Sequence, residues 1–424
     1  MITQESIENL KPFQARAIIE GLRKGLVPTE YVSFFTVGRQ NWLKFIEEDL
    51  DNFIAEGGGK VRFINGDYGD GKTHFMSVIR HLALQKNFAS SFVVLTRNVP
   101  IHKFELVYQE IVLQLSGHFD GVGLRALIHQ WVKEQKAVNL DRETLVQSLS
   151  QVSKLDSNFI NALAALVCDE PSDRAASAIP EENISSEEYL YQWFEGKKVT
   201  KKILAQFHVF ENLNKSNSKT FLQSLIAFLK LNNYRGLILL FDELETVMAQ
   251  GASIRNAAYE NIRLLMDNSE HSEFLHLFFS VIPDILLSEK GFKSYDALWS
   301  RVRSIGDSEA LNYRSTIIDL HKTPLKRQEL VRLGISLKQI HEISYRWNAQ
   351  ELVSDNLIEE MCKKQEELGV LSEVRLFIKQ MIRFLDLAEQ GNISHDYNLA
   401  DNLLASHREM EIEKTQRFEP VWDV

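Results

Sequence analysis

A glycine-rich stretch near residue 70 holds the residue types that bind phosphate. The pattern is G-x-x-x-x-G-K-T followed by a histidine, that is Gly66, Asp67, Tyr68, Gly69, Asp70, Gly71, Lys72, Thr73 and His74. Glycines let the backbone turn so that successive N–H groups face phosphate oxygens. In such a loop Lys72 reaches the β- and γ-phosphates, and the Thr73 hydroxyl binds Mg²⁺. The stretch therefore predicts a site for ATP and Mg²⁺.

The segments that flank this loop have the patterns of a strand and a helix. Residues 61–65 form an extended run, and apolar residues at helical spacing follow the loop at Phe75, Val78, Ile79 and Leu82. The helix would add the positive end of its dipole to the phosphate site. A chance glycine-rich turn is the alternative, and the order strand, loop, helix argues against it.

A pair of carboxylates follows a second apolar run. Residues 236–241 are apolar, and Asp242 and Glu243 come directly after them. Such a run is typical of a buried parallel strand, whose carboxyl end opens on the ligand crevice. We expect Asp242 to hold Mg²⁺ through water and Glu243 to act as the base that polarises the attacking water. The alternative is a buried strand with a coincidental Asp-Glu pair.

Three further residues are candidates for the reaction. Ser280 lies near the end of a strand-like run over 275–282, where ATPases of this kind place a small polar residue that contacts the attacking water or the γ-phosphate. Arg301 and Arg303 lie in a segment over 297–303 with the form that carries an arginine finger for a neighbouring subunit. Arg301 is slightly favoured over Arg303. For Ser280 the alternative is an ordinary serine at a strand exit.

Three other residues are candidates for contacts with the nucleotide. Gly38 and Arg39 precede a helix that leads into the phosphate loop, and in one ATPase clade such a pair lies by the adenine. Arg375 begins a late helix and is placed to reach the nucleotide from a helical lid. A turn glycine with a surface arginine is the alternative for the first pair, and a surface arginine for Arg375.

Composition sets broad limits. The chain has 424 residues, of which 44% are hydrophobic and 25% charged, which is typical of a globular protein with two or three domains. Its two cysteines, Cys168 and Cys362, are far apart and argue against a zinc site or a disulfide framework. No apolar run approaches the length of a membrane span, and the first residues are polar. A cytoplasmic protein without membrane contact is expected.

The order of patterns predicts an α/β fold, with a P-loop AAA+-like parallel sheet, a large helical insertion and a C-terminal helical lid domain. The strands are expected over 61–65, 91–96, 236–241, 275–282 and 316–320. The expected parts are N-terminal helices over 1–58, an ATPase core over 59–323 with the insertion over 104–232, the lid over 324–390 and a polar tail over 391–424. A polar stretch over 169–187 is expected to be a solvated linker.

The densest group of basic residues lies inside the insertion. It consists of Lys197, Lys198, Lys201 and Lys202. Since the net charge of the chain is −10, a contact with DNA has to come from a local basic face. A solvated helix face is the favoured alternative, because no aromatic residues alternate with these lysines.

Several segments together resemble one family. They are residues 15–28, 36–39, 66–73, 108–111, 236–245 and 372–375. The chain resembles the ATP-binding proteins of BREX bacteriophage-defence clusters, of the BrxD type, over about residues 11–390. These are AAA+-like P-loop ATPases akin to the initiator and STAND clades.

The resemblance assigns roles to single residues. It implies that Lys72 and Thr73 bind phosphate and Mg²⁺, that Asp242 serves the metal, that Glu243 is the base and that Arg375 is the lid arginine. Val374 stands where the lid motif of the family usually has proline.

The resemblance also leaves several functions open. One is an ATPase that acts in anti-phage defence, coupled to DNA or to a partner helicase. The alternatives are a STAND-like switch and a helicase loader with slow hydrolysis. Glu243 and the pair Arg301 and Arg303 favour turnover. If either arginine acts on a neighbour, the protein is a homo-oligomer, and other defence proteins are expected partners.

Overall fold

The computed structural model describes residues 7–168, 185–267, 273–303, 311–367, 369 and 373–392. The expected linker lies outside the described residues except for 185–187, and the expected polar tail lies outside them except for 391 and 392.

A five-stranded sheet forms the centre of the fold. Its order is β2-β3-β4-β1-β5. The strands are β1 (Gly59–Asn65), β2 (Ala89–Val94), β3 (Leu237–Asp242), β4 (Leu275–Val281) and β5 (Ile317–Asp319). The pairs β1–β4, β3–β4 and β2–β3 are parallel, which places the carboxyl ends of these four strands at one edge. The predicted α/β class with a parallel sheet is confirmed.

Strand β2 begins two residues before the predicted run. Ser90 and Ser91 are fully buried in it, and the Ser90 hydroxyl donates to the Ile238 carbonyl at 3.1 Å. Hydrophobicity alone left Ser90 outside the predicted strand, but this hydrogen bond lets Ser90 be buried at little cost.

The chain divides into two compact units. The first consists of residues 1–43, 66–78 and 319–424, and the second of residues 44–65 and 79–318. The phosphate loop and the predicted lid thus share the first unit with residues 1–43 of the N-terminal segment.

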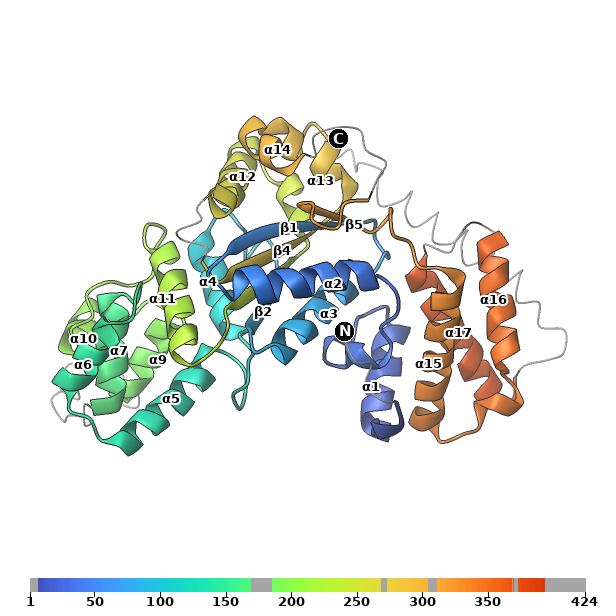
Figure 1. The fold of residues 1–424 in the computed structure, drawn as a ribbon, viewed down its shortest axis with the longest axis horizontal. Coiled ribbons are helices and arrows are strands. Elements are labelled where there is room, and N and C mark those ends of the chain that lie inside the picture. The colour runs from blue at the N-terminus through green and yellow to red at the C-terminus, as the bar shows by residue number, and fades with distance from the viewer. Residues whose placement is uncertain are drawn as a thin grey trace, which may run out of the picture. The chain divides into compact units, whose positions relative to one another are not determined.

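Helices from both ends of the chain pack together in the first unit (Figure 1). They are α1 (Pro12–Arg23), α15 (Arg327–Tyr345), α16 (Asp355–Glu367) and α17 (Val374–Glu389). Helix α1 contacts both α15 and α17, because Ala15, Ile18, Ile19 and Leu22 form one apolar face that is buried.

A polar network also holds α1 to these helices. Arg23 donates to the two carboxylate oxygens of Asp386 at 2.7 and 3.2 Å. Trp347 Nε1 donates to His341 Nδ1 at 2.9 Å, so His341 Nε2 is the ring nitrogen that donates to Asp386, at 3.0 Å. Burial raises the pKa of Asp386, but hydrogen bonds from His341 and Arg23 outweigh it and lower that pKa.

Asp386→Asn is expected to destabilise the first unit at neutral pH by about 1 to 3 kcal/mol, as for a lost hydrogen bond to a charged group. A carboxyl group with a lowered pKa stabilises the fold above its unfolded pKa of about 3.9, and that contribution disappears as the pH falls further. Unfolding of both proteins between pH 7 and 3 should therefore show a difference that shrinks below about pH 4. As a control, Glu366→Gln breaks an exposed 3.0 Å pair with Arg327 and should cost less than about 1 kcal/mol.

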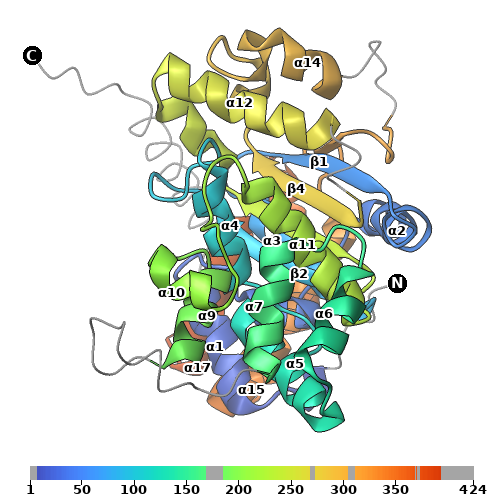
Figure 2. The ribbon, with the colours of Figure 1, turned by 90° about the vertical axis from the view of Figure 1, so that its left-hand side faces the viewer.

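The second unit joins the sheet to two groups of helices (Figure 2). The predicted helical insertion is confirmed as α4 (Phe104–Leu113), α5 (Leu124–Val138), α6 (Arg142–Ser150), α7 (Ser157–Cys168), α9 (Ser186–Phe194), α10 (Lys201–Gln206) and α11 (Ser218–Leu231). After β3 come α12 (Ala252–Asp267), α13 (Pro283–Leu287) and α14 (Asp296–Val302). Two further helices cross the boundary between the units, α2 (Gln40–Asp49) and α3 (Lys72–Gln85).

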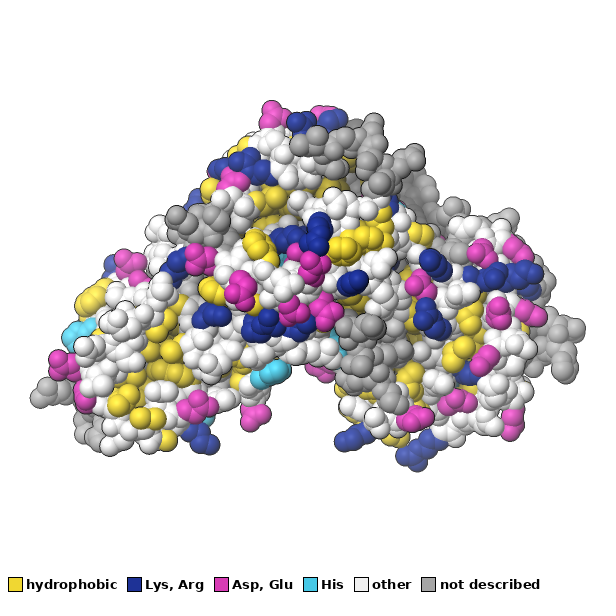
Figure 3. All heavy atoms as spheres, in the orientation of Figure 1, with side chains coloured by type: hydrophobic (Ala, Val, Ile, Leu, Met, Phe, Trp, Pro, Cys, Tyr) yellow, Lys and Arg dark blue, Asp and Glu magenta, His cyan; other side chains and the backbone are white. Residues whose placement is uncertain are grey.

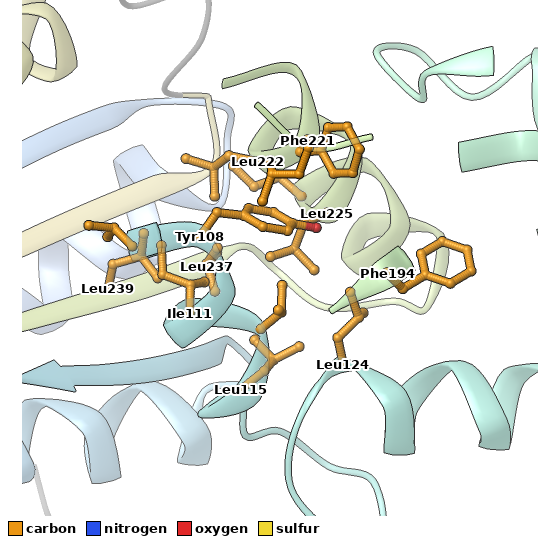
Figure 4. Close-up of a cluster of buried hydrophobic side chains, with 14 of the residues drawn as sticks. Tyr108, Ile111, Leu115, Leu124, Phe194, Phe221, Leu222, Leu225, Leu237 and Leu239 are labelled. Atoms are coloured by element: carbon orange, nitrogen blue, oxygen red, sulfur yellow. The ribbon is translucent and has the colours of Figure 1, made fainter. Parts of the chain in front are cut away.

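The insertion shares one hydrophobic core with the sheet. In Figure 4, Tyr108 on α4 lies among Leu237 and Leu239 of β3 and Phe221 of α11. The rings of Tyr108 and Phe221 meet edge to face with centroids 5.6 Å apart. The insertion is therefore packed into the core of this unit.

Tyr108→Phe is expected to stabilise the protein by about 1 kcal/mol, because it removes a buried polar group that is not hydrogen-bonded to any described residue. The Tyr108 side chain is fully buried, and its hydroxyl has no hydrogen-bond partner among the residues that the structure describes. Tyr108→Ala should instead cost about 3 to 5 kcal/mol through the cavity it leaves. Chemical denaturation of the three proteins measures both changes, and a marked loss of stability in Tyr108→Phe would contradict the expectation.

Candidate nucleotide-binding site

The phosphate loop in the first unit has the backbone that its glycines allow. Gly69 and Gly71 have φ angles of 102° and 83°, which residues with a side chain rarely adopt. The Phe75 N–H donates to the Gly71 carbonyl at 2.8 Å, and α3 begins at Lys72. The loop therefore turns directly into the start of a helix, the arrangement that binds anions.

Lys72 lies inside the loop. Its ammonium donates to the carbonyl oxygens of Gly66 at 2.8 Å and Asp67 at 3.0 Å, and the residue is buried. Phosphate oxygens that enter the loop would compete with these carbonyls for the same ammonium. The geometry fits the predicted role of Lys72.

Two acidic residues of the loop face a histidine that the sequence did not single out. His321 Nε2 lies 3.6 Å from an Asp67 oxygen and 3.4 Å from an Asp70 oxygen. Asp70 also accepts from the Asp67 N–H at 2.7 Å. Burial raises the pKa of Asp70, against the hydrogen bond from the Asp67 N–H. His321 follows β5, and no motif links it to the loop because about 250 residues separate them.

Arg39 supports the loop from a half-buried position. One of its nitrogens, Nη2, donates to the Asp70 carbonyl at 2.7 Å, and a Cβ atom added at Gly71 would lie 3.5 Å from its Nη1. Gly38 and Arg39 have positive φ angles of 71° and 56°. Burial lowers the pKa of Arg39 to about 10, so the side chain stays charged at neutral pH.

His74 packs beside this arginine. Its ring lies 5.2 Å from that of Phe35, centre to centre, and its Nε2 lies 3.3 Å from the Thr36 hydroxyl. Burial and then the charge of Arg39 lower the pKa of His74 to about 4. Arg39 and His74 thus contact the loop and its surroundings, and the adenine contact expected of Gly38 and Arg39 stays a prediction.

Arg375 lies next to the loop within the first unit. It is exposed near the start of α17, and a Cβ atom added at Gly69 would lie 3.7 Å from its Cβ. The predicted lid arginine is therefore placed against the phosphate loop, with Val374 as the first residue of its helix.

Asp242, Glu243 and Ser280 meet in the second unit. Asp242 ends β3 and is 6% exposed, and Ser280 in β4 is fully buried. The Ser280 hydroxyl donates to Asp242 Oδ1. The Glu243 N–H donates to the Ser280 hydroxyl at 2.9 Å and to Asp242 Oδ1 at 3.0 Å. Tertiary structure thus joins Ser280 to the pair Asp242 and Glu243, which the sequence predicted separately from it.

The two candidate finger residues differ in their contacts. Arg301 is bonded to Asp267 through Nε and to the Ala297 carbonyl through Nη1. Arg303 is exposed directly after α14. These contacts do not distinguish which of the two arginines would act as an arginine finger.

The four clustered lysines of the insertion, at positions 197, 198, 201 and 202, are exposed. Lys197 pairs with Glu195 at 2.6 Å, and Lys201 and Lys202 form the first turn of α10.

Strand β1 runs through a glycine loop into helix α3, and β3 of the same parallel sheet ends at Asp242, directly before Glu243. This arrangement defines a Walker-type P-loop fold. The model of the BREX system ATP-binding protein BrxC/D family matches residues 10–403. The chain belongs to this family, as its sequence pattern indicated, and ATP binding is implied by that membership.

The chain was also compared with solved structures and with curated proteins. A Walker-type ATPase of Pyrococcus abyssi is similar in structure, with 12% identity and a TM-score of 0.39 over 90% of this chain and 76% of that one. None of the curated proteins compared with the chain matches it.

Among the described residues, no helix is both long and apolar enough to cross a membrane.

Proposed function

We propose that this protein binds ATP with Mg²⁺ and hydrolyses it, as an AAA+-like ATPase of a bacterial anti-phage defence system. The observation that carries the proposal is the arrangement of Asp242, Glu243 and Ser280 at the carboxyl ends of β3 and β4. The same sheet contains β1, which leads directly into the phosphate loop. Carboxylates in this position serve metal binding and water activation in P-loop enzymes.

Each residue would have a separate task. Lys72 donates hydrogen bonds to phosphate oxygens, and Glu243 accepts a proton from the water that attacks the γ-phosphorus while ADP leaves. The Thr73 hydroxyl and the buried Asp242 carboxylate are oxygen donors of the kind that Mg²⁺ prefers. When bound, Mg²⁺ would neutralise charge that develops on the phosphate oxygens.

Coupling to DNA or to a partner helicase is part of the proposal. The exposed lysines at 197, 198, 201 and 202 support a contact with phosphates. On the face shown in Figure 3, basic and acidic side chains are interspersed. A DNA contact would therefore be local, as the net charge of −10 also requires.

Assembly into a homo-oligomer follows if Arg301 or Arg303 reaches the γ-phosphate of a neighbouring subunit. Arg303 is exposed for such a contact. Arg301 would first have to leave Asp267, so nucleotide-dependent assembly and this ion pair would compete.

A nucleotide-dependent switch is the second candidate, favoured by one observation. Arg375 of α17 lies against Gly69 of the phosphate loop, and the loop, α1 and the lid helices form one compact unit. Nucleotide in the loop would change the contacts of Arg375 directly, and slow hydrolysis would reset them. A helicase loader would use the same device.

The test is ATP hydrolysis by the full chain with and without duplex and single-stranded DNA, while light scattering follows oligomer mass. The proposal expects turnover that DNA accelerates. Replacing the four lysines by glutamine should weaken that acceleration and flatten its salt dependence, whereas the exposed pair Lys290→Gln and Lys293→Gln should not. Tight binding with negligible hydrolysis, indifferent to DNA, would favour the switch.

A further inference from the structure

The Ser280 hydroxyl is hydrogen-bonded to two neighbouring residues. Its hydroxyl donates to Asp242 Oδ1 and accepts from the Glu243 N–H at 2.9 Å. The side chain is fully buried. Ser280 is paired with Ile64 of β1 in the parallel ladder between β4 and β1. Strand β4 lies between β3 and β1 in the sheet, so Ser280 has a neighbouring strand on each side.

The donors and acceptors of a serine limit what else it can bind. A hydroxyl has one hydrogen to donate and two lone pairs to accept with. Phosphate oxygens of bound ATP only accept hydrogen bonds. While Ser280 donates to Asp242, it has no hydrogen for the γ-phosphate.

Glu243 needs the support that this arrangement gives. Its φ and ψ angles are 62° and 43°, a left-handed conformation that costs a residue with a side chain about 1 to 2 kcal/mol. Such a conformation persists where the surroundings fix it. Here the Glu243 N–H is held between the Ser280 hydroxyl and Asp242 Oδ1.

We propose that Ser280 is a positioning residue, which fixes the Asp242 carboxylate and the backbone of Glu243 and does not contact the γ-phosphate. The proposal rests on the proposed function, since it assigns Asp242 to the metal and Glu243 to the water. It replaces the direct contact with the γ-phosphate that the sequence predicted for Ser280. Ser280 would therefore act on metal affinity and turnover, and not on recognition of the third phosphate.

The test compares Ser280→Ala with the wild type in two binding measurements. In EDTA, the ratio of ATP to ADP affinity should be unchanged, because no bond to the γ-phosphate is lost. Titration of Mn²⁺ in the presence of ADP, followed by electron paramagnetic resonance, should show metal affinity lowered about 10- to 100-fold, as for other residues that orient a metal ligand. A selective loss of ATP affinity, or unchanged Mn²⁺ affinity, would overturn the proposal.

Further variants at Ser280 and Ser90 separate the effect of the Ser280 hydroxyl from the effect of side-chain size. Ser280→Thr keeps the hydroxyl and should restore Mn²⁺ affinity, while Ser280→Cys keeps the size with a weak donor and should not. Ser90→Ala removes another fully buried strand serine, bonded to a carbonyl, and should leave Mn²⁺ affinity unchanged. At saturating Mg²⁺, Ser280→Ala should lower kcat with little change in KM for ATP. If the wild type does not hydrolyse ATP, the proposed function fails, but both binding measurements still decide the role of Ser280.

Discussion

Glu243→Gln is expected to lower the rate of ATP hydrolysis at least about 100-fold, which is the lower end of what a general base contributes. Glutamine keeps the size of the side chain but cannot accept the proton of the attacking water. The N–H of residue 243, which holds it to Ser280 and Asp242, is also kept. Affinity for ATP should therefore change little, and the variant should accumulate in the ATP-bound state.

Single-turnover hydrolysis and ATP titration measure the two effects separately. Glu289→Gln is a matched control, because it makes the same change in a side chain that is 90% exposed, and it should hydrolyse ATP like the wild type. Retained turnover in Glu243→Gln would show that another group activates the water. Equal and negligible rates in the variant and the wild type would instead favour the switch.

Lys72→Ala is expected to weaken the binding of ATP and ADP by about 10- to 100-fold, as for the loss of charge-assisted hydrogen bonds worth 1.5 to 3 kcal/mol. The ammonium lies inside the loop and donates to the Gly66 and Asp67 carbonyls. Phosphates in the loop would take over these donors. Adenosine, which has no phosphate, should bind the variant and the wild type equally.

Calorimetric titration with ATP, ADP and adenosine checks the expectation for Lys72. Lys363→Ala removes an exposed lysine of the same unit and should leave all three affinities unchanged. Melting temperatures of the unliganded proteins show whether the loop still folds. A loss of adenosine affinity as large as that of ATP would place the effect in the fold of the loop and not in phosphate binding.

The phosphate loop and the strand before Asp242 were predictable because their signals are local. Gly69 and Gly71 have the positive φ angles that the motif requires, and the apolar run before Asp242 is buried along its whole length in β3. The family also followed from such segments, and its model matches residues 10–403. Local signals placed the start of β2 two residues late, because Ser90 is a polar residue that is buried through its hydrogen bond to the Ile238 carbonyl of the neighbouring strand.

Other features depend on residues that are far apart in the chain. Hydrogen bonds join Arg39 to the Asp70 carbonyl and Ser280 to Asp242, and Arg23 binds Asp386 across the sequence. No periodicity or motif encodes such pairs, because each partner alone is compatible with an ordinary surface or strand position. The roles assigned to these residues stay predictions until the variants are measured.

By itself, the sequence determined the fold class, the family and the position of the phosphate loop, since glycine spacing and continuous apolar runs act over a few residues. Only the tertiary structure decided that Arg39 supports the loop, that Arg375 lies against Gly69, and that the Ser280 hydroxyl is used by Asp242 and Glu243. The physical reason is that the directions of buried hydrogen bonds are set by the packing of distant segments, which a linear pattern does not contain.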